Sequence, residues 1–186
     1  MKKALCFTIC ILCVFLFAGC GSNETTSRPT LETEASGVDI VKYVKLGTIP
    51  EIKYTLGDDG NAIITAFEES EDEYFSIMDG EEYTTVITPD NANLIFETGD
   101  KKKEIKYIVS FGKSYGFETE TDSNTVTSVM EEKGYSASLE EIPEDLAKFV
   151  PGGPGCDCLS YTIEDTALHF VFDNNYLAAT IIYKKG

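Results

Sequence analysis

Apolar and polar residues alternate along much of the chain after residue 50, and clusters of Gly, Asp and Asn interrupt the alternation. A period of two is typical of strands buried on one face, and such clusters are typical of tight turns. We therefore predict at least four strand–turn–strand units. They lie at 52–67 with a turn at 57–61, at 74–88 with a turn at Asp79-Gly80, at 93–109 with a turn at 99–104, and at 168–183 with a turn at 173–175.

Helix signals are confined to residues 122–149. Asp122 can cap a helix at 123–133, in which Val126, Val129 and Met130 recur at helical spacing. Residues 138–141 have the spacing of a capping box, ahead of a second short helix at 143–149. The sequence therefore predicts an α+β fold, mainly an antiparallel sheet built from hairpins, with two short helices.

The N-terminus has the pattern of an export signal. Two lysines precede an apolar run from Ala4 to Gly19, which is shorter than the roughly 20 residues that a membrane-spanning helix needs. The run ends in Leu16-Phe17-Ala18-Gly19-Cys20, which resembles the lipobox of bacterial lipoproteins, although Phe17 stands where leucine is usual. That resemblance implies cleavage before Cys20, a diacylglycerol lipid such as a palmitate-bearing one on its thiol, and a lipid-anchored, extracytoplasmic location. The alternatives are an ordinary signal peptide followed by a chance cysteine, and an uncleaved anchor.

This N-terminal pattern divides the chain into three parts. Residues 1–19 are the expected signal peptide. Residues 20–37 are the expected lipidated cysteine and a disordered tether, because they are nearly free of large apolar residues. Residues 38–186 are the expected α+β domain, either as one unit or as two repeats represented by the hairpins at 93–109 and 168–183. In the order of its elements, the last part of the chain is similar to the repeat of beta-lactamase inhibitor-like binding modules.

Charge restricts the partners. With 15 basic and 32 acidic residues the formal net charge is −17, which argues against nucleic acid because that affinity comes mainly from clustered Lys and Arg. It also argues against electrostatic attraction to anionic lipid. Residues 54–100 hold 13 acidic residues and no basic one, which we interpret as a solvated loop and a polar sheet face. The alternatives are a calcium site and a surface for a basic partner.

Cys156-Asp157-Cys158 is the most unusual group of residues in the domain. Outside the cytoplasm paired thiols are normally oxidised. On an extended strand, however, their Cα atoms would be about 6.6 Å apart, near the limit for a disulfide. We expect a local structural disulfide or two inert thiols. Pairing with another chain, a redox role, and a metal site completed by His169 are alternatives.

No catalytic constellation stands out. His169 lies in an alternating run, and we expect it to be a sheet residue facing away from Leu168 and Phe170. The sequence therefore predicts no enzyme, cofactor or metal, but a membrane-anchored lipoprotein that binds a ligand or a protein partner. The alternative is an envelope hydrolase using scattered carboxylates. Acids of raised pKa in a deep pocket would favour the enzyme, and an aromatic patch or an open strand edge would favour binding.

Overall fold

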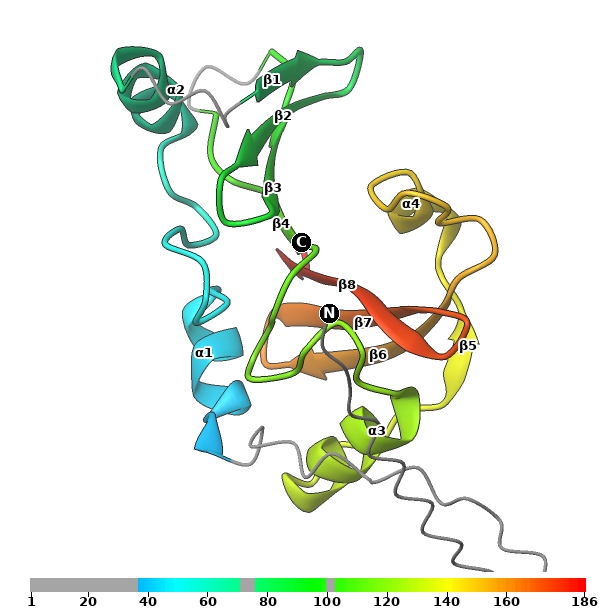
Figure 1. Cartoon of the computed structure of the whole chain (residues 1–186). Coiled ribbons are helices and arrows are strands. Elements are labelled where there is room, and N and C mark those ends of the chain that lie inside the picture. The colour runs from blue at the N-terminus through cyan, green and yellow to red at the C-terminus, as the bar shows by residue number, and fades with distance from the viewer. Residues whose placement is uncertain (1–36, 71–75, 100–102) are drawn as a thin grey trace, which may run out of the picture. The chain divides into compact units, whose positions relative to one another are not determined.

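One antiparallel sheet organises the part of the chain that the computed structural model describes, which is residues 37–70, 76–99 and 103–186. The sheet has eight strands in the order β1-β2-β3-β4-β8-β7-β6-β5 (Figure 1). The strands are β1 (Ser76–Asp79), β2 (Tyr83–Thr88), β3 (Ala92–Glu97), β4 (Tyr107–Ser110), β5 (Leu139–Glu141), β6 (Asp157–Ile163), β7 (Thr166–Asp173) and β8 (Tyr176–Lys184). The predicted antiparallel sheet of hairpins is thus confirmed.

Three of the four predicted hairpins are present. They are β1–β2, β3–β4 and β7–β8, and each is paired in antiparallel register. Strand β8 also pairs with β4, with Tyr107 opposite Tyr183, and this pairing joins the two halves of the sheet.

The predicted hairpin at 52–67 is wrong. Residues from Gly60 onward form helix α2 (Gly60–Glu69), and Asp59 caps it by accepting a hydrogen bond from the Asn61 N–H at 2.9 Å. Asp-Gly can open a helix as readily as it can turn a hairpin. Gly60 is required here because a Cβ would lie 2.3 Å from the Lys103 carbonyl oxygen. The apolar residues Ile63, Ile64 and Phe67 pack on the core at helical spacing.

The two predicted helices are present as α3 (Ser123–Glu132) and α4 (Glu144–Ala147). As predicted, the Asp122 side chain caps α3, accepting a hydrogen bond from the Thr125 N–H at 3.0 Å. The capping box predicted at 138–141 is wrong, because residues 139–141 form β5 and pair with β6. An unpredicted helix, α1 (Ile40–Leu46), precedes the sheet. No helix in the described ranges is long and apolar enough to cross a membrane.

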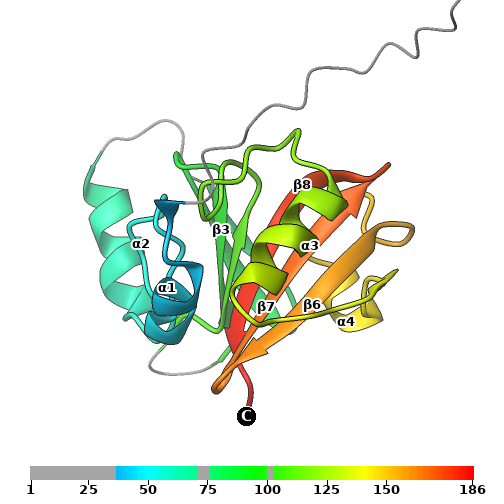
Figure 2. The ribbon, with the colours of Figure 1, turned by 90° about the horizontal axis from the view of Figure 1, so that it is seen from below.

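The two faces of the sheet are covered differently. Helices α1, α2 and α3 lie on one face (Figure 2), and their buried residues join Leu94, Phe96, Ile182 and Phe170 of the sheet in one large core. Short α4 and the residues that follow it pack on the other face, against a smaller cluster that includes Val109, Val171 and Ile181. The smaller cover leaves part of that second face accessible.

Candidate functional site: an aromatic row on the second face

The second face carries a row of aromatic rings that crosses several strands. Tyr83, Tyr107 and Tyr183 come from β2, β4 and β8, and Phe149 comes from the turn after α4; we call these four residues the aromatic row. The Tyr107 and Tyr183 rings are 5.2 Å apart between centroids, and the Tyr83 and Tyr107 rings are 5.9 Å apart. Phe149 lies 5.3 Å from Tyr83 and 5.0 Å from Tyr107. Tilted and edge-to-face rings at these distances stabilise one another.

Strand pairing places these rings together. Tyr107 and Tyr183 are direct cross-strand partners, and such pairs have neighbouring side chains on one face. All four rings are half-buried, whereas the aromatic residues Tyr115, Phe117 and Phe170 beneath the helices are fully buried. The row therefore combines packed rings with accessible ring surface.

The Tyr107 and Tyr183 hydroxyls stay protonated at physiological pH. Burial raises the pKa of Tyr107 to about 12, and its neighbours Tyr83 and Tyr183 add to the shift. Burial also raises the pKa of Tyr183, with a further contribution from Asp145 of α4. Neutral hydroxyls can donate and accept hydrogen bonds, so the row offers both apolar and polar contacts.

One end of the aromatic row already holds a cation. The Lys148 Nζ lies 4.5 Å from the centroid of the Tyr83 ring and 5.3 Å from that of Phe149. It also forms an ion pair of 3.0 Å with Glu82, in which the two side chains are 42% and 74% exposed. Exposed ion pairs and cation–π contacts each contribute about 1 kcal/mol or less, so a competing cation can replace Lys148.

Carboxylates surround the aromatic row. Glu82 pairs with Lys148, and exposed Glu97 is the cross-strand partner of Tyr83. Exposed Asp145 is close enough to raise the pKa of Tyr107 and of Tyr183. Of these, only Glu97 is a strand residue within 54–100, because Glu82 lies in the turn before β2 and Asp145 lies in α4, so the polar sheet face stays a prediction. The densest acidic segment includes Glu71, Asp72 and Glu73, which lie outside the described residues.

His169 extends the aromatic row on β7. Its ring stacks parallel to that of Tyr183, with 5.6 Å between centroids, while Leu168 and Phe170 face the opposite core. The predicted orientation of His169 is thus confirmed. Its Nδ1 shares a hydrogen bond of 2.9 Å with the Ser160 hydroxyl, which lies 3.3 Å from the Cys158 Sγ.

The Ser160–His169 pair lacks the features of an activated nucleophile. Burial lowers the pKa of His169 to about 4, so the ring is neutral and weakly basic at physiological pH. Its buried Nε2 has no hydrogen-bond partner in the described ranges, and therefore no third group there orients the ring. This geometry supports a structural contact between neighbouring strands.

The Cys156 and Cys158 side chains are both buried in the smaller cluster, on the same face of the sheet. In this structure they are free thiols. The Cys156 thiol donates to the Gly152 carbonyl oxygen at 3.5 Å, whereas Cys158 contacts Ser160. Burial raises the pKa of both thiols, which disfavours the reactive thiolate. The disulfide between them stays a prediction for the exported protein.

Cys20, the predicted lipid-attachment residue, lies outside the described residues. The structure does not support the alternative of a metal site on Cys156, Cys158 and His169, because no three His, Cys, Asp or Glu side chains in the described ranges come together in that way.

Sequence reasoning missed the aromatic row and the Ser160–His169 pair. A usable signal existed for the pair, because Glu164-Asp165 is a two-residue turn that sets Ile163 opposite Thr166 and hence Ser160 opposite His169. The aromatic row depends on the β4–β8 pairing between distant segments, which no local pattern indicates.

Comparison with known proteins adds little to this geometry. No known protein-family model matches the chain, and no curated protein matches it. Among solved structures, a DUF4309 family protein (YjgB) from Bacillus subtilis is similar, with a TM-score of 0.48 and 15% sequence identity. The alignment covers 81% of this chain and 99% of that one.

Proposed function

We propose that this chain is a membrane-anchored extracytoplasmic lipoprotein, with lipid on Cys20, and that its sheet domain is a binding module for a protein partner. The anchor is supported by Ala18-Gly19-Cys20 at the end of the apolar run. Two acyl chains hold a protein stably at a membrane, where one chain binds reversibly.

The half-exposed aromatic row carries the binding part of the proposal. Tyr and other aromatic residues are enriched where proteins associate, because one ring supplies large apolar contact area and, in Tyr, a hydrogen-bonding group. The surrounding carboxylates Glu82, Glu97 and Asp145 favour a partner that presents Lys or Arg around its contact. Lys148 over the Tyr83 ring illustrates how such a cation would be received.

The test of the anchor is metabolic lipid labelling of the full chain and of Cys20→Ala. We expect the label and detergent-phase partitioning in the first protein and neither in the second. Label on the Cys20→Ala protein would overturn the anchor.

Site-specific photo-crosslinking in intact cells tests the binding surface. A photoreactive phenylalanine analogue would replace Tyr83, and in the matched control it would replace Tyr176, an exposed tyrosine outside the row. We expect a discrete crosslinked protein from position 83 that is absent from position 176 and weakened by high salt. The same product from both positions, or none from position 83, would overturn the assignment of this surface.

A further inference from the structure

A second surface lies where the described domain begins. Helix α1 buries Ile40 and Val44 in the larger core and presents Lys42, Lys45 and Leu46 outward. Leu46 is 57% exposed, which is high for a leucine in a helix packed on a core. A shallow, open hollow of about 380 Å³ is lined by these three residues together with Asp39 and Val41.

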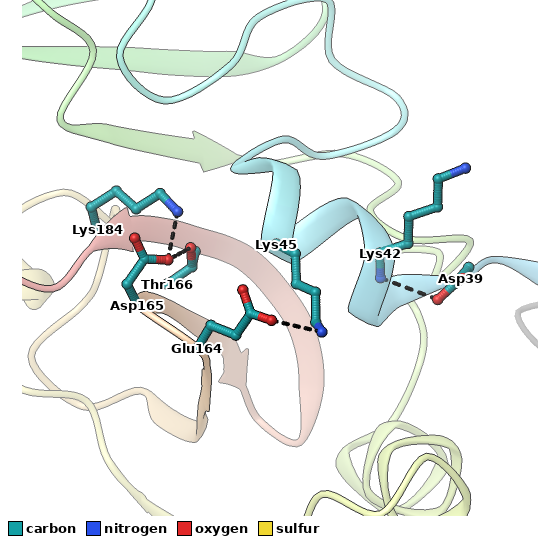
Figure 3. Close-up of polar contacts among 7 residues, drawn as sticks. All are labelled: Asp39, Lys42, Lys45, Glu164, Asp165, Thr166 and Lys184. Carbon is teal, nitrogen blue, oxygen red and sulfur yellow. Dashed lines mark hydrogen bonds and ion pairs between the residues drawn. The ribbon is translucent and has the colours of Figure 1, made fainter.

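More lysines lie around the β6–β7 turn, which Lys45 of α1 also contacts. Lys45 forms a 2.7 Å ion pair with Glu164 in the β6–β7 turn, and Lys184 bonds the neighbouring Asp165 at 2.7 Å (Figure 3). Lys185 donates to the Thr162 hydroxyl at 2.7 Å, at the same end of β6. We call Lys42, Lys45, Leu46, Lys184 and Lys185 the lysine end.

The lysines of the lysine end are exposed, and their ion pairs with carboxylates can be replaced by other contacts. The hydrogen bond from Lys184 lowers the pKa of Asp165. The hydrogen bond that Lys45 donates to Glu164 raises the pKa of Lys45. Asp165 and Lys45 therefore stay ionised. The Lys42 ammonium points away from the Asp39 carboxylate, which accepts a hydrogen bond from the Lys42 backbone N–H instead (Figure 3). Exposed ion pairs contribute little, and hence lipid phosphates can replace the carboxylates as partners.

The length of chain before the domain keeps the lysine end within reach of the bilayer. Residues 21–36 separate Cys20 from Gly37, and even fully extended they reach about 60 Å. Asp39, which caps α1, is two residues beyond Gly37, so α1 is the first described element after the lipid. The acid-rich stretch 54–100, which an anionic surface repels, begins after α1.

We propose that the lysine end rests on anionic lipid headgroups, with Lys42, Lys45, Lys184 and Lys185 near the phosphates and Leu46 at the headgroup boundary. This inference rests on the proposed lipid on Cys20. The lysines are attracted to such a surface, and the neighbouring carboxylates of Asp39, Glu164 and Asp165 offset part of that attraction. The remainder has only to orient a domain that the lipid already holds. This proposal revises the expectation that the net charge of the chain excludes attraction to anionic lipid, because the lysines and the carboxylates are unevenly distributed over the domain.

Amide hydrogen exchange of the full lipidated chain on vesicles tests the proposal. One vesicle preparation is phosphatidylcholine alone, and the other is phosphatidylcholine mixed with phosphatidylglycerol. We expect exchange over residues 40–46 to be several-fold slower on the anionic vesicles, with the difference lost at high salt and in Lys42→Glu with Lys45→Glu. Lys148→Glu is the matched control, because Lys148 also pairs with a carboxylate but adjoins α4 on the opposite face.

Each result decides one of the two proposals. If mass spectrometry finds lipid on Cys20 and residues 40–46 exchange equally on both vesicles, the lysine end does not contact lipid although the anchor stands. Equal loss of protection in Lys148→Glu would also overturn the lysine end. If Cys20 carries no lipid, the anchor fails and this inference fails with it. Unchanged exchange in β7 shows that each variant is folded.

Discussion

The two faces of the sheet use aromatic residues in opposite ways. On the helix-covered face, Phe170 is fully buried and packs edge-on against Phe117 at 5.4 Å and against Tyr115 and Tyr161 at 6.2 Å. On the other face, the rings of the aromatic row are half-buried and surrounded by carboxylates. Full burial suits stability, and partial burial suits association, because accessible ring area remains to be covered by a partner.

The largest expected effect separates the faces by stability. Phe170→Ala should lower the free energy of unfolding by about 4 kcal/mol, since it removes a fully buried ring and leaves a cavity. Phe149→Ala, on the half-exposed face, should cost less than half as much. Chemical denaturation of both variants measures the difference, and equal losses would contradict the contrast between the faces.

Glu51 stabilises the helix-covered face through the backbone. Its carboxylate accepts hydrogen bonds from the Tyr115 and Gly116 N–H groups, each at 2.9 Å, and so positions the buried Tyr115 ring. Glu51→Ala should cost about 3 kcal/mol, because two charge-assisted bonds are lost and two N–H groups are left without a partner. Glu51→Gln retains one acceptor and should cost less. Equal urea midpoints for wild type and Glu51→Ala would show that this contact is dispensable.

His169 gives the second face a pH dependence. Burial lowers its folded-state pKa to about 4, while the unfolded chain takes up the proton near 6.5. Stability from this residue is therefore complete above pH 6.5 and is lost as the pH falls towards 4, by about 2–3 kcal/mol. Urea unfolding of wild type and His169→Asn across this range isolates the effect, because the carboxylates titrate alike in both proteins. Parallel curves would contradict the shift.

The smallest expected effect on stability is that of Lys148→Ala, which tests the role of the aromatic row in binding. Lys148→Ala should change stability by less than about 1 kcal/mol, because the Lys148 ion pair and cation–π contact are exposed. If Lys148 covers the ring surface that a cation of the partner would contact, its removal should increase crosslinking from position 83. Reduced crosslinking with unchanged stability would instead make Lys148 part of the contact.

Local sequence patterns predicted most of the strands and two of the helices, but they did not always distinguish a helix from a hairpin. Asp122 was correctly interpreted as a cap because a helical spacing follows it, whereas Asp59-Gly60 was misread because a turn and a cap favour the same residues. Helix α1 is short and rich in β-branched residues, so its propensity does not favour a helix, and packing of Ile40 and Val44 decides its conformation. The pairing of Tyr107 with Tyr183 joins segments far apart in the chain, and for that reason the aromatic row could not be predicted from sequence.

The central position of β8 has a consequence for how the chain matures. A polypeptide is made from its N-terminus, yet β4 waits for residues 180–183 to supply its second neighbour. Until residues 180–183 are available to pair, β4 presents a bare edge of the kind that recruits other chains. A chain in which β8 has not yet paired is therefore vulnerable to aggregation, and a truncation that removes β8 would leave β1–β4 and β5–β7 without the strand that joins them.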